Sequence, residues 1–156
     1  MPYALGDLAR SLTRFDPAPR HRGPRPAAVA TATAASLLLC LLADVLLVRI
    51  GTAVFPETRG YEHFEFADYT KLTVIGVVIG CLAWPAVARL SSDPRWIFLR
   101  LAVAVTAFLL LPDLWIWARG QPGQAVLVLI WMHLAIGLIT YNLLVGLAPV
   151  RPPPGS

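Results

Sequence analysis

The sequence has little charge for its length. Only 14% of its 156 residues are Asp, Glu, Lys or Arg, whereas 57% are hydrophobic and the mean hydropathy is +0.66. About a quarter of the residues in a soluble domain are usually charged. This shortage argues against a soluble enzyme and indicates a protein that is solvated by lipid.

Cysteine is scarce, and lysine is nearly absent. The two cysteines, Cys40 and Cys81, lie inside apolar runs and form no Cys-x-x-Cys motif. Buried cysteines usually behave as small hydrophobic residues, and the alternative here is a redox-active or cross-linked pair. Twelve of the thirteen basic residues are Arg, which we attribute to a GC-rich genome. No basic helix with interleaved aromatic residues is present, so we expect no nucleic-acid partner.

The sequence also lacks the usual signatures of catalysis. It contains no nucleophile beside a base and no glycine-rich phosphate loop. The residues most similar to a set of metal ligands are Glu62, His63, Glu65 and Asp68, but their spacing matches no established metal site. These residues also suit a solvated acidic loop. We therefore expect no metal and no cofactor. Whether the protein is an enzyme stays open, with a non-enzymatic role favoured.

Four long apolar runs dominate the chain. Each approaches the ~20 residues that a transmembrane helix needs, so we predict an all-α membrane protein with an antiparallel bundle of four transmembrane helices. The first run is longer than the about 7–15 apolar residues of a signal peptide, and we expect it to remain as the first span. The predicted spans are residues 27–48, 72–88, 97–117 and 124–147, within a transmembrane domain of residues 27–148. A basic, proline-rich segment (1–26) precedes this domain, and a proline-rich tail (149–156) follows it.

The basic residues predict an orientation. About nine lie in the two terminal segments and in or beside the loop between the second and third spans, whereas four lie in or beside the other two connections. Cytoplasmic loops carry an excess of Lys and Arg. We therefore expect both termini in the cytoplasm, the plasma (inner) membrane as the location, and the acidic first loop outside.

Small and polar residues predict how the helices pack. Ser36, Cys40 and Asp44 follow one another at four-residue steps, so they share one helical face. Small residues allow close approach of helices in lipid, and Gly76 and Gly80 have the small-xxx-small spacing of such contacts. We also expect Pro85 to kink or end the second helix.

Three ionisable residues inside the predicted spans are the candidates for a functional site. Taken from the span midpoints at 1.5 Å per residue, Asp44 and Asp113 lie ~9 Å toward the outside and His133 ~4 Å toward the same side. An ionisable residue in the membrane is costly unless it is paired or hydrated, and it marks a functional site by default. This shared depth predicts a ligand-binding or proton-binding site.

Each of these residues also has a purely structural interpretation. Asp113 follows Pro112 and could cap a frayed helix end that is open to water. Asp44 could bond to hydroxyl groups of a neighbouring helix and so fix the packing. His133 could be a satisfied hydrogen-bond donor between helices.

The layout resembles a family of uncharacterised small four-span membrane proteins of actinobacteria. The likeness rests on the basic, proline-rich start, the long first outer loop, and the motifs Leu111-Pro112-Asp113 and Met132-His133-Leu134 of the last hairpin. The resemblance implies a compartment and a layout, and no activity.

Three functional hypotheses follow. The favoured one is a non-enzymatic helical bundle in the lipid bilayer that assembles with itself or with a larger membrane complex. The alternative is a small-molecule-binding or proton-binding protein with an outer-leaflet site formed by Asp44, Asp113 and His133. A membrane-embedded enzyme that uses two carboxylates and a histidine for acid–base work ranks last.

Overall fold

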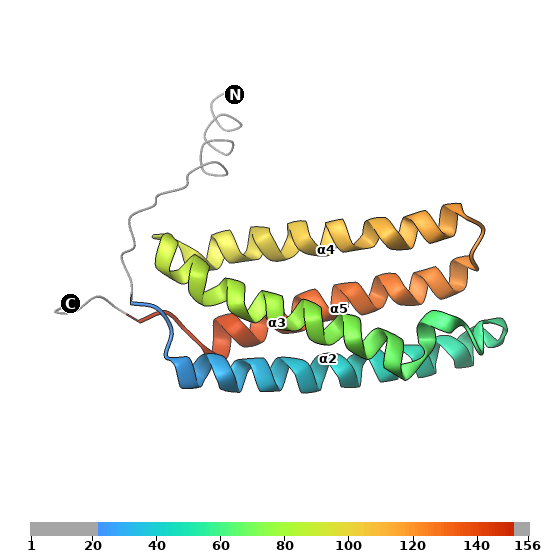
Figure 1. Ribbon diagram of the computed structural model, residues 1–156, viewed down its shortest axis with the longest axis horizontal. Coiled ribbons are helices and arrows are strands. Elements are labelled where there is room, and N and C mark those ends of the chain that lie inside the picture. Colours follow the sequence, from blue (N-terminus) through green and yellow to red (C-terminus); the bar gives the residue numbers. More distant parts are fainter. Residues whose placement is uncertain (1–21, 152–156) are drawn as a thin grey trace, which may run out of the picture.

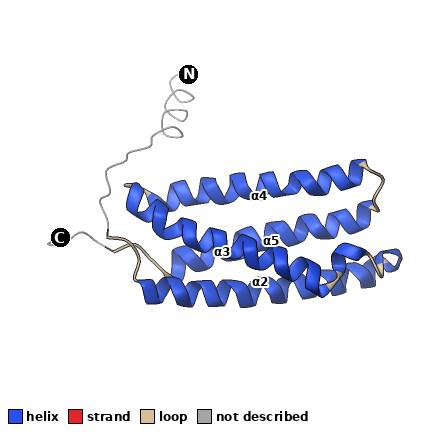
Figure 2. Ribbon diagram, in the orientation of Figure 1, coloured by secondary structure: helices blue, strands red, loops and turns tan. Residues whose placement is uncertain are grey.

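The computed structural model describes residues 22–151, and the structure is helical throughout this range apart from short connections (Figure 2). Most of the predicted basic segment, residues 1–21, and the end of the predicted tail, residues 152–156, lie outside the described residues. All four long helices are long and apolar enough to cross a membrane, as the sequence predicts. They are α2 (Pro26–Val54), α3 (Phe66–Leu90), α4 (Pro94–Ala118) and α5 (Gly123–Leu147), with two short 3₁₀ turns, η1 (Pro56–Thr58) and η2 (Glu62–Phe64), between α2 and α3.

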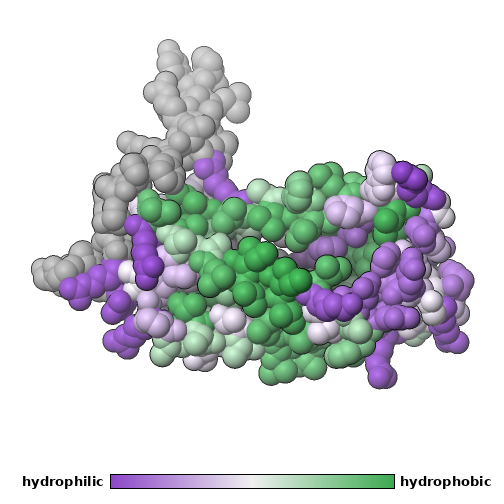
Figure 3. All heavy atoms as spheres, in the orientation of Figure 1, coloured by the Kyte–Doolittle hydropathy of each residue, from purple (hydrophilic) through white to green (hydrophobic). Residues whose placement is uncertain are grey.

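The four helices lie side by side, and α5 contacts each of the other three. Residues 22–25, residues 148–151 and the α3–α4 connection meet at one end of the bundle, which we call the tail end (Figure 1). The α2–α3 loop and the α4–α5 turn meet at the opposite end, the loop end. Green apolar surface covers the middle of the bundle, and purple polar residues gather at both ends (Figure 3). This distribution suits a bilayer around the middle.

The helices extend further than the predicted spans. α2 continues to Val54, and α3 already begins at Phe66, so part of the segment expected as a loop is helical. The expectation that Pro85 ends the second helix is wrong, because α3 runs on to Leu90. Neighbouring helices stabilise a proline-containing membrane helix by packing against it. Here the buried indole of Trp84, one residue earlier, donates a hydrogen bond from Nε1 to the Ala148 carbonyl at 2.8 Å.

The interpretation of Asp113 as part of a frayed helix end is also wrong. α4 contains Pro112 and stays helical to Ala118, one turn beyond the carboxylate. Asp113 is one of only three buried residues of this helix, with Pro94 and Phe98. Its side chain therefore belongs to the interior of the bundle.

Small and polar side chains form the buried face of α2. Ala32, Ser36, Cys40 and Asp44 are each fully buried at four-residue steps, which is the spacing of a ridge that fits into the groove of a facing helix. Sγ of Cys40 lies 3.6 Å from the Thr140 hydroxyl of α5. Both cysteines are free thiols, so a Cys40–Cys81 cross-link is absent.

Glycines mark the closest contacts between helices. A Cβ atom at Gly51 of α2 would lie 2.5 Å from a methyl carbon of Val128 on α5, and one at Gly80 would lie 3.3 Å from a methyl carbon of Thr140. A Cβ at Gly76 would meet no atom within 4 Å. The predicted close approach along Gly76 and Gly80 therefore involves Gly80 and not Gly76.

Alanine at these glycines should have opposite effects on stability. Gly51→Ala forces the β-branched side chain of Val128 to move, and we expect it to lower the free energy of unfolding by about 1–3 kcal/mol. Gly76→Ala is the matched control, because it adds a methyl group in open space and should raise stability by about 0.5–1 kcal/mol. Thermal unfolding of both variants in the same detergent measures the difference. Equal melting temperatures would contradict the close α2–α5 contact.

Candidate functional site

Asp113 of α4 and His133 of α5 are in direct contact. Nδ1 of the imidazole lies 2.9 Å from Oδ2 of the carboxylate. The Asp113 side chain is 6% exposed, and the His133 side chain is 26% exposed. The last hairpin of the chain thus holds an acid and a base together within its two apolar helices, while the imidazole keeps part of its surface outside the bundle.

The surroundings of His133 indicate which ring nitrogen carries the proton. Nδ1 also lies 3.0 Å from the carbonyl oxygen of Leu129, one turn earlier on α5. A carbonyl and a carboxylate are both acceptors, so Nδ1 must be the donor. Its proton is directed at Leu129, and Oδ2 of Asp113 lies beside it without a hydrogen bond of its own among the described residues. Nε2 is then the nitrogen that can gain or lose a proton.

Asp44 of α2 forms a second polar contact in the interior. It is fully buried, and its Oδ2 accepts a hydrogen bond from the Thr73 hydroxyl of α3 at 2.7 Å. Its other oxygen, Oδ1, has no hydrogen-bond partner within residues 22–151. Asp44 forms no hydrogen bond or ion pair with His133 or Asp113. The three candidates therefore form one direct pair, Asp113 and His133, with Asp44 as a more distant charge.

The α2–α3 loop covers the loop end of this region. Tyr61 and Phe64 pack against a buried cluster that includes Leu129 and Met132, the neighbours of His133 on α5. Burial raises the pKa of the Tyr61 phenol, and the nearby carboxylates of Glu62 and Asp113 raise it further. The Tyr61 phenol is therefore neutral at the loop end of the bundle.

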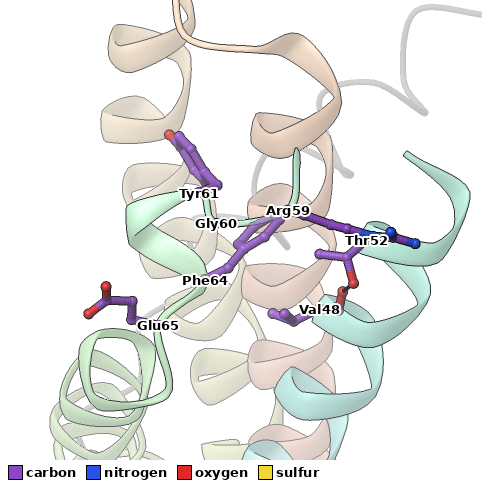
Figure 4. Close-up of a pocket in the computed structure, with 7 residues that line it drawn as sticks. All are labelled: Val48, Thr52, Arg59, Gly60, Tyr61, Phe64 and Glu65. Atoms are coloured by element: carbon purple, nitrogen blue, oxygen red, sulfur yellow. Dashed lines mark hydrogen bonds between the residues drawn. The ribbon is translucent and has the colours of Figure 1, made fainter. Parts of the chain in front are cut away.

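The same loop borders a shallow cavity of about 320 Å³. In Figure 4, Phe64 and Arg59 extend over α2, whereas Tyr61 and Glu65 point away from it. The cavity is lined by Val48, Thr52, Arg59, Gly60, Tyr61, Phe64 and Glu65. It contains none of the three candidate residues, and its polar groups do not converge on one point, so we assign it no ligand.

The acidic residues of the loop pair locally. Nδ1 of His63 lies 3.2 Å from a carboxylate oxygen of Asp68, and Nε2 lies 3.8 Å from one of Glu62. Within the part of the chain that the structure describes, no three His, Cys, Asp or Glu side chains are arranged to hold a metal ion. The loop therefore has the features of an ordinary charged surface.

The hydroxyl bond that the sequence analysis offered for Asp44 is present, although Thr73 was not named as the residue that forms it. The Leu129 carbonyl beside His133 has no signature in a sequence. The signal for Thr73 was available, because a buried carboxylate needs a donor and a threonine at similar depth on a neighbouring helix can supply one.

Removal of the Thr73 hydroxyl should destabilise the bundle. Thr73→Val leaves the buried Asp44 carboxyl without its donor, and we expect a loss of about 2–3 kcal/mol in the free energy of unfolding. Thr70→Val is the matched control on the same helix, since its buried hydroxyl has no partner among the described residues and its replacement by a methyl group should leave stability unchanged or raise it. Chemical or thermal unfolding in micelles compares the two. A similar effect of both variants would show that the Asp44–Thr73 bond contributes little.

Comparison with known proteins gives one result. No curated protein and no solved structure matches the chain. A protein-family model, described as a family of unknown function (DUF6069), matches residues 16–149, which include all four long helices and the three candidate residues. The chain therefore belongs to the DUF6069 family, a family of unknown function.

Proposed function

We propose that this chain is a non-enzymatic integral membrane protein that reversibly binds a proton at the Asp113–His133 pair. The observation that supports this proposal is the 2.9 Å contact between the two side chains inside an apolar hairpin. When Nε2 takes up a proton, the imidazole becomes a cation, and the adjacent Asp113 carboxylate compensates its charge. A cationic group of a small molecule could bind in the same place, against the same carboxylate.

Exposure favours a binding role over a purely structural one. A polar pair that serves only to hold two helices together is best enclosed, because each unpaired group in hydrocarbon is costly. Here the Asp113 side chain is nearly enclosed and about a quarter of the His133 side chain is exposed. The pair therefore has access to the surroundings of the bundle.

The proposal includes a placement in the cell. We infer an antiparallel four-helix bundle in the plasma membrane, with both termini in the cytoplasm, because basic residues are concentrated at the tail end. The Asp113–His133 pair then lies in the outer half of the bilayer. The resemblance to four-span proteins of actinobacteria supports an actinobacterial source for the chain.

Assembly is the second candidate function, and α4 supports it. No residue from Leu99 to Pro112 is buried, and Val103 and Phe108 are 61% and 68% exposed. A transmembrane helix that packs so little against its own bundle is suited to contact a second copy or a larger membrane complex. The mass of the protein in lipid nanodiscs tests this candidate, and a strict monomer would contradict self-assembly.

Proton binding can be measured on the protein in nanodiscs. Titration between pH 5 and 9 should show that His133→Gln takes up one proton fewer per chain than the parent protein, because its imidazole is lost. Asp113→Asn should shift the pH of this step, because the neighbouring charge is gone. The matched control is Asp68→Asn, which removes the carboxylate beside His63 and should leave the His133 step in place.

Two results would contradict the proposal. One is an equal proton uptake by the parent protein and His133→Gln. The other is a His133 step that does not respond to Asp113→Asn.

A further inference from the structure

The tail end of the bundle has a large excess of positive charge. Six arginines lie there within the described residues, against a single carboxylate, Asp93. Oδ1 of Asp93 is 3.5 Å from the Trp96 amide at the start of α4, where it caps the helix. The six arginines are Arg22, Arg25, Arg89, Arg95, Arg100 and Arg151.

Backbone pairing places two of these arginines opposite each other. The Arg22 amide donates to the Arg151 carbonyl at 3.0 Å, and the Arg151 amide donates to the Arg22 carbonyl at 2.9 Å. Residues paired in this antiparallel manner have adjacent side chains, and like charges in such a pair repel. Nε of Arg151 also donates to the Gly23 carbonyl at 3.0 Å, which fixes its guanidinium beside the pairing.

Arg89 at the end of α3 adds a third cation. A Cβ atom at Gly23 would lie 3.7 Å from Cγ and Nε of Arg89, so the side chain of Arg89 lies against the same segment. The backbone pairing of Arg22 with Arg151 and the contact of Arg89 with Gly23 thus bring three arginines from separate parts of the chain to one segment. None of the three forms an ion pair with a carboxylate among residues 22–151.

We propose that Arg22, Arg89 and Arg151 bind the phosphate of an anionic phospholipid at the tail end of the bundle. A planar guanidinium matches the oxygens of a phosphate, and a bound anion removes the repulsion between the paired arginines. The cluster lies where α2 begins and where α3 and α5 end, which is the headgroup level of a bilayer around the apolar middle. Basic pockets beside transmembrane helices are suited to anionic lipid headgroups.

The neighbouring surface favours a lipid over a free phosphate. Leu90 at the end of α3 and Leu147 at the end of α5 are 61% and 47% exposed next to the arginines. A phospholipid can place its phosphate on the guanidinium groups and its acyl chains on these leucines. Free phosphate would use only the first of these contacts.

Native mass spectrometry of the detergent-solubilised protein can measure this binding. Titration with phosphatidylglycerol should give an affinity that falls roughly fivefold for each single Arg→Gln change, which corresponds to about 1 kcal/mol per arginine, and about a hundredfold for the variant R22Q/R89Q/R151Q. Binding of phosphatidylcholine should be weak and equal in all variants. The matched control is R49Q/R59Q/R119Q, which removes the same charge toward the loop end and should retain the affinity for phosphatidylglycerol.

Two further arms separate the alternatives. The variant R22K/R89K/R151K preserves the charge without the guanidinium geometry and should bind more tightly than R22Q/R89Q/R151Q but less tightly than the parent protein. A purely structural role of the arginines would not show this partial rescue. Glycerol 3-phosphate at millimolar concentration should not displace the lipid. Efficient displacement would assign the site to a soluble phosphate, and equal lipid binding by R22Q/R89Q/R151Q and the loop-end control would overturn the proposal.

Discussion

A carboxylate inside a membrane must have a partner, and this requirement organises the bundle. Two of the carboxylates, Asp44 and Asp113, lie on helices α2 and α4, and both are buried. Asp44 accepts a hydrogen bond from α3, and Asp113 contacts the histidine of α5. These two contacts join α2 to α3 and α4 to α5. Each contact matters for stability, because an unpaired carboxylate in hydrocarbon would cost several kcal/mol.

The small residues of α2 and α5 make these polar contacts possible. Short side chains let the helices approach closely, and Gly51 and Gly137 lie where even a methyl group would collide with Val128 or Thr106. Without a hydrophobic driving force between helices in lipid, such packing must supply much of the stability. The interior is therefore narrow and polar in places, while many large apolar side chains, including Leu38 and Phe108, face outward.

Much of this architecture follows from the sequence, because apolar runs of sufficient length have few other possible structures. The ends of the helices were harder to place. Aromatic and charged residues such as Phe66 and Asp68 suit both an interfacial loop and a first helical turn, and the structure assigns them to α3. Pro85 and Pro112 suggested breaks, but packing against neighbouring helices keeps both α3 and α4 continuous.

The sequence predicted that the three candidate residues lie at a similar depth in the bundle. It did not predict the directions in which their side chains point. Counting residues along the helices placed Asp44, Asp113 and His133 in the same half of the bundle. The rotation of each helix about its axis determines which of them touch, and no sequence pattern defined that rotation. This is why the Asp113–His133 contact was a hypothesis, and why a hydroxyl partner of Asp44 was expected without being identified as Thr73. The pairing of Arg22 with Arg151 had no signal at all.

The central claim is that Asp113 and His133 form one unit inside the bundle. Nitrogen-15 NMR of histidine-labelled protein in bilayers tests it most directly, with His133→Gln used to identify the signals of this residue among those of the three histidines. The structure predicts that Nδ1 of His133 carries a proton and that its signal moves in Asp113→Asn, because Nδ1 lies 2.9 Å from Oδ2. A neutral His133 with its only proton on Nε2, and with a spectrum that ignores the Asp113 substitution, would contradict the account.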